Sequence, residues 1–190
     1  KAIYNDLEWI GLSYKFKVSQ SSRLKLYNDI ADKLKNKGLI YPCYETPDEL
    51  NLKRKMLLRS GMPPIYDRSS LKLSDKEKAN YEKEGRTPHW RFKLSAEKIN
   101  WDDLIHDKIT FDKLSISDPV VIRSDKTPLF TLTSVIDDAE FGVTHILRGD
   151  DHITNTAAQI QLFHQIGCKS IPIFGHLPLV KSINGESLSK

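Results

Sequence analysis

The chain of 190 residues contains 39% hydrophobic and 28% charged residues, which is typical of a folded globular protein and excludes a disordered one. No apolar run approaches the roughly 20 residues that span a bilayer, and the first residues lack the pattern of a signal peptide. The net charge is only +4, but residues 51–98 carry 13 basic and 6 acidic groups, a balance of +7. This segment favours a polyanionic partner such as nucleic acid, although a lysine-rich solvated surface explains the charge equally well.

The two cysteines, Cys43 and Cys168, lie far apart in the sequence, and neither belongs to a C-x-x-C pair. This spacing disfavours a disulfide framework or a structural zinc site and is typical of a reducing cytoplasm. We therefore expect both cysteines to be free thiols that pack as small apolar side chains.

The first 40 residues predict two helices. The first helix ends at Gly11. The second begins with Ser21 as its N-cap and ends at Gly38. Their apolar faces comprise Ile3, Leu7 and Ile10 in the first helix, and Leu24, Tyr27, Ile30, Ala31 and Leu34 in the second.

The middle of the chain predicts two further helices and several short strands. The run L-I-Y-P-C-Y is a candidate strand. Thr46 then caps a helix that has Pro47 at its first position and continues through the basic stretch to about Ser60. A polar helix follows at about 75–84, W-R-F-K-L predicts a strand, and short strands and turns occupy 99–117.

From Asp118 the pattern becomes rich in strands. D-P-V-V-I-R-S and L-F-T-L-T-S-V-I, separated by a turn, predict two strands in a hairpin-like arrangement. V-T-H-I-L-R predicts a strand, A-A-Q-I-Q-L-F-H-Q-I-G a helix, and I-P-I-F-G-H-L-P-L-V a buried strand. Strand, helix and strand with short joints form a β-α-β unit, which requires parallel strands.

Two loops should lie at the carboxyl edge of this parallel sheet, where ligands bind in open α/β folds. One carries R-G-D-D-H and the other carries G-E-S-L-S-K. An arginine at a strand end suits a carboxylate, the adjacent glycine admits a ligand to the backbone, and the lysine can neutralise a phosphate. The alternative interpretation is structural: Asp150 and Asp151 favour the N-terminus of the next helix, and Arg148 pairs with one of them.

Several spaced motifs resemble the bacterial glutamyl-tRNA synthetases and match that family in order and spacing over all 190 residues. They are D-L-E-W-I-G-L, Q-S-S-R, Y-P-C-Y-E-T-P-D-E-L, P-H-W-R-F-K, S-V-I-D-D-A-E-F-G-V-T-H-I-L, R-G-D-D-H-I-T-N-T, H-L-P-L-V and G-E-S-L-S-K. The resemblance implies less than half of a complete enzyme, without its N-terminal H-I-G-H region and its anticodon-binding region.

The resemblance implies an α/β fold of the class I synthetase kind, in which a Rossmann-like parallel sheet is split by an inserted α+β domain that binds the tRNA acceptor arm. Residues 1–23 would belong to the first half of the catalytic domain, residues 24–128 to the inserted domain, and residues 129–190 to the second half, up to the K-L-S-K-type loop. The basic segment 51–98 falls inside the insertion, which favours tRNA as its polyanionic partner.

The implied reaction joins glutamate to ATP, forming glutamyl-adenylate, and passes the glutamyl group to the terminal adenosine of tRNA(Glu). ATP and Mg²⁺ enter as the substrate complex, and neither zinc nor another resident metal is expected. The resemblance allows tRNA(Gln) as a second substrate and implies a cytoplasmic monomer. We expect this portion alone to be inactive, because the other side of the adenylate site is absent from it.

Site residues are implied position by position. Lys190 matches the second lysine of the K-L-S-K loop and would act in catalysis by stabilising the transferring phosphate charge. The glutamate site would comprise Arg148, Phe130 and Ser134, and the ATP site would comprise Gly149, Asp151, His152, Leu179, Val180, Leu188 and Lys190.

The sequence departs from the family pattern in several places. Ser187 replaces the first lysine of the loop, Phe130 replaces a usual tyrosine, and Ser134 replaces an amide or small apolar residue. Because Tyr44 and Glu45 follow the first cysteine, the cysteine zinc site of some members cannot form. Two alternatives therefore remain: the shorter glutamyl-Q tRNA(Asp) synthetase-like paralogue, which glutamylates a modified tRNA base, and a tRNA-binding module without catalysis.

Overall fold

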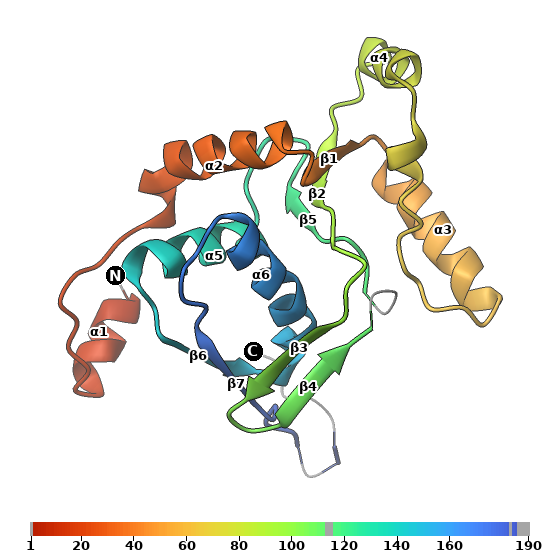
Figure 1. Cartoon of the computed structure of the whole chain (residues 1–190). Coiled ribbons are helices and arrows are strands. Elements are labelled where there is room, and N and C mark those ends of the chain that lie inside the picture. Colours follow the sequence, from red (N-terminus) through yellow and green to blue (C-terminus); the bar gives the residue numbers. More distant parts are fainter. Residues whose placement is uncertain (1, 113–115, 183, 186–190) are drawn as a thin grey trace.

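The computed structural model describes residues 2–112, 116–182 and 184–185, which form six α-helices and seven strands (Figure 1). The α-helices are α1 (Ala2–Trp9), α2 (Leu24–Asn36), α3 (Pro47–Arg59), α4 (Asp75–Lys83), α5 (Phe130–Phe141) and α6 (Ile153–Gln165). The strands are β1 (Ile40–Cys43), β2 (His89–Phe92), β3 (Ile99–Asp103), β4 (Asp107–Phe111), β5 (Val120–Ile122), β6 (His145–Gly149) and β7 (Ile173–Leu177). Short 3₁₀ helices are η1 (Gln20–Arg23), η2 (Ser69–Lys72) and η3 (Asp150–His152). In this described part, no helix is both long and apolar enough to span a membrane.

The strands form two sheets. One is three-stranded and antiparallel, with the order β1-β2-β5, and the other has the order β4-β3-β7-β6. β6 and β7 are parallel, which confirms the predicted β-α-β unit. β3 pairs with β7 in parallel through Asp103 and Phe174, and forms an antiparallel hairpin with β4. The hairpin, although it lies within residues 24–128, therefore extends the sheet that contains β6 and β7.

One hydrophobic core connects the two sheets with α2, α5 and α6. α3 and α4 lie at one end of the molecule, away from α5 and α6, and α1 lies at another edge (Figure 1). Burial of these apolar side chains is the main stabilising contribution to the fold. The large side chains that are fully buried in this core include Tyr27, Leu34, Phe92, Val121, Leu132, Phe163 and Phe174.

The strand predicted over L-F-T-L-T-S-V-I is wrong, because this segment begins helix α5. Its threonines and valine imitate a strand composition, but Leu132, Val135 and Ile136 are buried at helical spacing. Gly142, with φ 63°, ends the helix in the left-handed region that favours glycine.

The predicted N-cap of the second helix is also wrong. Ser21 lies inside η1, and α2 begins three residues later without a side-chain cap. Leu24, expected on the apolar face, is 48% exposed. The first helix is present as α1, but the expected apolar face is largely open, since Ile3 is 72% exposed and no residue of α1 is buried among the described residues.

Helix α3 begins as predicted. The Thr46 hydroxyl accepts a hydrogen bond from the backbone N–H of Glu49, and the Glu49 carboxylate accepts one from the backbone N–H of Thr46. Pro47 occupies the first helical position, where its missing N–H has no cost. This capping box stabilises the helix by about 1 kcal/mol.

Candidate active site

The carboxyl ends of the parallel strands β6 and β7 lie side by side. Arg148 pairs in register with His176, and Gly149 pairs with Leu177. The chain then turns through η3 into the N-terminus of α6. The edge predicted to bind ligands therefore presents Arg148 beside a helix N-terminus.

Arg148 is held by side chains from helix α6 and strand β7. Its Nη2 donates to Thr156 Oγ1 at 2.5 Å and to Gln159 Oε1 at 2.6 Å, and its Nε donates to His176 Nε2 at 3.5 Å. The structural alternative, in which Arg148 pairs with Asp150 or Asp151, is therefore wrong. Asp150 Oδ1 instead accepts a hydrogen bond from His106 Nε2, in the turn between β3 and β4, at 2.8 Å.

The guanidinium of Arg148 keeps a free edge and its charge. Among the described residues, hydrogen bonds occupy Nε and Nη2, and none occupies Nη1. Burial lowers the pKa of Arg148, and the negative charges of Asp138 and Asp151 oppose this change. An arginine remains a cation at neutral pH in such a setting, so the site offers a partly desolvated positive charge.

Gln159 connects the three residues implied for glutamate binding. Its Nε2 donates to Ser134 Oγ at 2.7 Å, while its Oε1 accepts from Arg148. Ser134 Oγ donates to the carbonyl of Phe130 at 2.7 Å, and the Phe130 ring meets His152 edge to face at 5.5 Å. Gln159 was not predicted from the sequence; it lies three residues after Thr156 on α6, and both side chains accept from Arg148.

Part of the implied ATP site also assembles here. A Cβ atom placed on Gly149 would lie 2.5 Å from Asp151 Oδ1 and 3.0 Å from Leu179 Cδ2, so the position requires glycine or a shift of both neighbours. Val180 is 74% exposed, and its side chain lies open to solvent. The remaining implied residues, Leu188 and Lys190, lie outside the described residues together with Ser187.

Comparisons with known proteins identify the family of this fold. The sequence matches the family described as tRNA synthetases class I (E and Q), catalytic domain, over residues 1–190. The chain belongs to this family. It is 48% identical over its whole length to the glutamate–tRNA ligase of Azospirillum brasilense and 50% identical to glutamate–tRNA ligase 2 of Methylorubrum populi, covering 42% of each.

Solved structures agree with this assignment. The synthetase domain superposes on a glutamate tRNA ligase from Elizabethkingia meningosepticum, crystallised in complex with its amino acid, with a TM-score of 0.84 and 26% identity. The glutamate–tRNA synthetase of Elizabethkingia anophelis gives 0.85 and 26%. Both comparisons cover 98% of this chain and 41% of the other. The chain thus spans less than half the length of the relatives it matches.

Besides Asp151, the carboxylate of Asp138 on α5 interacts electrostatically with Arg148, and this residue was not predicted from the sequence. Burial, together with the charge of Asp137, raises the pKa of Asp138 to about 6, and the charge of Arg148 opposes this rise. Asp137 is different, because it accepts hydrogen bonds from Arg23 and Tyr27. Of these two adjacent carboxylates on α5, Asp138 is the one whose charge acts on Arg148, whereas Asp137 is bonded to η1 and α2.

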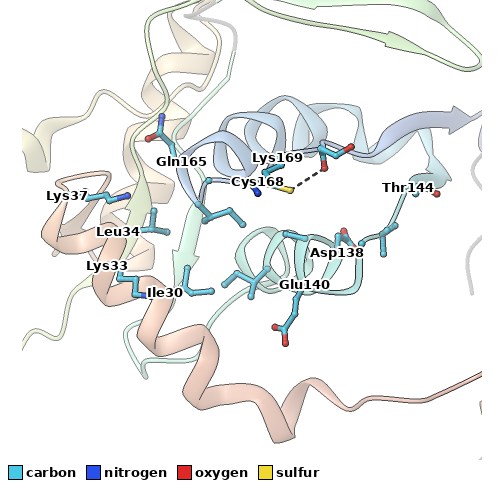
Figure 2. Close-up of a pocket in the computed structure, with 17 residues that line it drawn as sticks. Ile30, Lys33, Leu34, Lys37, Asp138, Glu140, Thr144, Gln165, Cys168 and Lys169 are labelled. Atoms are coloured by element: carbon cyan, nitrogen blue, oxygen red, sulfur yellow. Dashed lines mark hydrogen bonds between the residues drawn. The ribbon is translucent and has the colours of Figure 1, made fainter.

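A separate pocket lies away from Arg148. It has a volume of about 610 Å³ and is lined by α2, by the end of α5 and by the turn between α6 and β7 (Figure 2). Thr144 and Ser170 in its lining precede β6 and β7, so the pocket is at the amino ends of the parallel strands, opposite Arg148. Its Lys33 and Lys37 lie at the C-terminus of α2, where cations offset the helix dipole.

Helix α3 carries a basic surface. Arg54, Lys55 and Arg59 are exposed, and within the described part of the chain none of them forms an ion pair. The helix lies at the end of the molecule away from α5 and α6 (Figure 1). Three unpaired cations on one projecting helix are typical of a surface that contacts phosphates.

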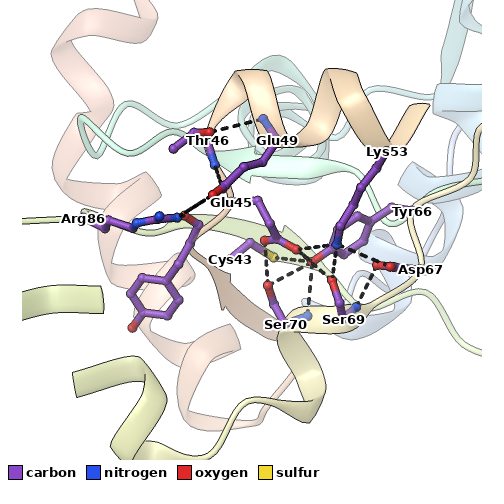
Figure 3. Close-up of polar contacts among 11 residues, drawn as sticks. Cys43, Glu45, Thr46, Glu49, Lys53, Tyr66, Asp67, Ser69, Ser70 and Arg86 are labelled. Carbon is purple, nitrogen blue, oxygen red and sulfur yellow. Dashed lines mark hydrogen bonds and ion pairs between the residues drawn. The ribbon is translucent and has the colours of Figure 1, made fainter. Parts of the chain in front are cut away.

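A polar cluster centred on Glu45 fixes α3 to the rest of the molecule (Figure 3). The carboxylate of Glu45 accepts hydrogen bonds from Tyr66 at 2.8 Å, Ser69 at 2.8 Å and Ser70 at 2.7 Å, and from Lys53 of α3 at 3.4 Å. Burial alone would raise the pKa of Glu45, but these hydroxyl donors lower it to about 2. The cluster therefore keeps a charged carboxylate in a half-buried position and connects β1, η2 and α3.

Both cysteines have the free thiols expected from the sequence. Cys43 is fully buried beside this cluster, and Cys168 is half-buried at the end of α6. Within the described residues, no group of three or more histidine, cysteine, aspartate or glutamate side chains is arranged to hold a metal ion.

Proposed function

We propose that the full-length protein containing this chain ligates glutamate to tRNA(Glu). It forms glutamyl-adenylate from glutamate and ATP, with release of pyrophosphate, and transfers the glutamyl group to the 3′-terminal adenosine of the tRNA. Two observations support this: over the aligned 189–190 residues the chain is 48–50% identical to the named glutamate–tRNA ligases, and the residues at the carboxyl edge suit a carboxylate substrate.

The position of Arg148 carries the proposal. Its Nε and Nη2 are held by β7 and α6, while no hydrogen bond from the described residues occupies Nη1 of this partly desolvated cation. Such a guanidinium binds a carboxylate strongly and with defined orientation. Phe130 and Ser134 are the other proposed neighbours of the glutamate, with the phenylalanine ring contributing apolar contact in place of a tyrosine hydroxyl.

ATP would bind beside this carboxylate site. Gly149, Asp151, His152, Leu179 and Val180 are its proposed neighbours, and the missing side chain at the glycine lets a ligand approach the backbone. Leu188 would contact ATP, and Lys190 would neutralise charge on the transferring phosphate together with the Mg²⁺ that accompanies the nucleotide.

The tRNA would bind through α3 and its surroundings. We assign residues 24–128 to the part that contacts the acceptor arm, because the exposed cations of α3 lie within it. tRNA(Gln) is a second candidate substrate, and a cytoplasmic monomer is the proposed form. The 190-residue chain alone is proposed to be inactive.

The test is glutamate-dependent ATP–pyrophosphate exchange by the full-length protein in the presence of tRNA. We expect exchange with glutamate, an increase of more than 100-fold in the glutamate KM of R148Q, and a change of less than about twofold in R123Q, which removes an exposed arginine. Absence of exchange, with tRNA still bound, would establish a binding module instead.

The same preparation separates the ligase from the base-modifying paralogue. Ribonuclease A cleaves RNA after pyrimidines, so it releases glutamate carried at the 3′ end of tRNA as glutamyl-adenosine. We expect labelled glutamate to be recovered in this product. Label on an internal oligonucleotide instead would show that glutamate is attached to a base and would reject the proposal.

A further inference from the structure

A buried chain of hydrogen bonds extends from Arg148 across the sheet to β3. Thr156 Oγ1 lies 2.8 Å from His176 Nε2, and His176 Nδ1 lies 2.5 Å from Asp103 Oδ2. The side chains of His176 and Asp103 are fully buried, and Thr156 is 0% exposed. The chain therefore runs without contact with solvent between Arg148 and Asp103.

The donors and acceptors in this chain have one consistent direction. The guanidinium of Arg148 can only donate, so Thr156 Oγ1 and His176 Nε2 accept from it. The Thr156 hydroxyl then donates to His176 Nε2, which is a shorter contact than its 3.3 Å approach to the carbonyl of His152. Nε2 is thus an acceptor, and the imidazole proton lies on Nδ1, where it donates to Asp103.

Asp103 is fixed as the terminal acceptor. Its Oδ1 accepts three backbone N–H groups, from Ile105 at 3.1 Å, His106 at 3.3 Å and His176 at 3.1 Å. Burial alone would raise the pKa of Asp103, but the hydrogen bonds from the His176 side chain and these backbone groups lower it well below its usual range. The carboxylate therefore stays ionised and can accept only.

We propose that Asp103 and His176 are positioning residues, which act through Thr156 to fix Arg148 in the orientation that binds the substrate carboxylate. The inference rests on the proposed glutamate-binding role of Arg148. Asp103 sets the imidazole tautomer, the imidazole directs the Thr156 hydroxyl away from the guanidinium, and the hydroxyl oxygen is left to accept from Nη2. Arg148 then needs no rearrangement when glutamate arrives, which favours binding.

Substitution D103N tests the tautomer argument with little change of volume. The three N–H groups at Oδ1 require the asparagine oxygen at that position, so its NH₂ group replaces Oδ2 and points at His176 Nδ1. The imidazole proton must move to Nε2, where it faces the Nε–H of Arg148. We expect the KM for glutamate to rise about tenfold or more, with kcat and the KM for ATP within about twofold.

A purely structural role for the cluster predicts a different result, and a second buried aspartate provides the control. The side chain of Asp118 is 0% exposed and accepts from Tyr41, Arg68 and the backbone N–H of Leu94, in the other sheet. D118N should lower the Tm by an amount comparable with D103N and leave the KM for glutamate unchanged. An equal rise of the glutamate KM in both variants would overturn the proposal.

A substitution pair at Thr156 keeps the test decisive if D103N does not fold. T156V has the same shape without the hydroxyl, and T156S retains it. In the full-length protein, we expect T156V to reproduce the rise in the glutamate KM and T156S to restore the original value. A T156V enzyme with an unchanged glutamate KM would overturn the proposal.

The failure of this inference is distinct from failure of the proposed function. If R148Q raises the glutamate KM but D103N and T156V do not, Arg148 binds glutamate without needing the chain, and only the positioning role is rejected. If R148Q itself has no effect on the glutamate KM, the assigned role of Arg148 fails, and the positioning role fails with it.

Discussion

Substitution of Glu45 by glutamine should weaken the junction between α3 and the three-stranded sheet. The carboxylate accepts from the hydroxyls of Tyr66, Ser69 and Ser70, all between 2.7 and 2.8 Å, and its side chain is 14% exposed. Glutamine has the same shape, but its NH₂ group faces hydroxyls that donate in the native structure. The change therefore removes a charge and opposes donors to donors.

The contribution of the Glu45 carboxylate to the free energy of unfolding follows from its pKa. A fall from the ordinary value of 4.5 to about 2 corresponds to about 3 kcal/mol of stability at neutral pH. Because the folded pKa is depressed, this contribution is complete above pH 4.5 and is lost as the pH falls toward 2. About 2 kcal/mol of it should be gone by pH 3.

Urea unfolding followed by circular dichroism measures this effect. We expect E45Q to lower the free energy of unfolding by about 2–3 kcal/mol at pH 7 and by distinctly less at pH 3. The matched control is E49Q, four residues away on exposed helix α3, where glutamine also completes a capping box; its loss should stay below about 1 kcal/mol. If E45Q lowers the free energy of unfolding by less than about 0.5 kcal/mol, or by the same amount at pH 7 and pH 3, the assigned role of the Glu45 carboxylate is wrong.

Three further predictions concern the site, the basic helix and the acid beside Arg148. G149A places a methyl group 2.5 Å from a carboxylate oxygen and 3.0 Å from a leucine methyl, so the KM for ATP should rise severalfold while the KM for glutamate changes little; an unchanged ATP KM argues against nucleotide at this edge. Replacing Arg54, Lys55 and Arg59 together by alanine should reduce the salt dependence of tRNA binding, with the slope of log K against log salt concentration falling by about 2–3; an unchanged slope places the tRNA elsewhere. Burial, with the charge of the preceding aspartate, raises the pKa of Asp138 to about 6, so its ionisation costs stability as the pH rises from about 4 through 6. In urea unfolding, the free energy of unfolding of D138N should therefore exceed that of the wild type by about 1–2 kcal/mol at pH 7.5 and be close to it at pH 4. A difference that does not change with pH would show that the ionisation of Asp138 is not its cause.

Local signals in the sequence predicted much of the fold. α3 was predictable because Thr46, Pro47 and Glu49 form a capping box whose geometry is decided within four residues. The parallel pair β6–β7 was predictable because a strand, a helix and a strand follow one another with short joints. Helix α5 was wrongly predicted as a strand because it is rich in β-branched residues, which are typical of strands. The helical spacing of its buried residues was the correct signal.

The sequence predicted the residues that would face the ligands, but not the residues that hold Arg148 in place. Arg148 and Gly149 were identified because they end a parallel strand, and strand ends converge on ligands. Gln159, which connects Arg148 to Ser134, carries no motif of its own, and only its place on α6 brings it there. The pairing of β3 with β7 rests on one residue pair more than 70 positions apart in the sequence, so no local pattern could place Asp103 beside the site.

The most direct test is a crystal structure of the full-length protein with glutamate bound. We expect a glutamate carboxylate within hydrogen-bond distance of the Arg148 guanidinium, with Phe130 and Ser134 beside it and the Thr156 contact retained. Glutamate bound at a place where Arg148 does not reach it would contradict the proposed role of Arg148.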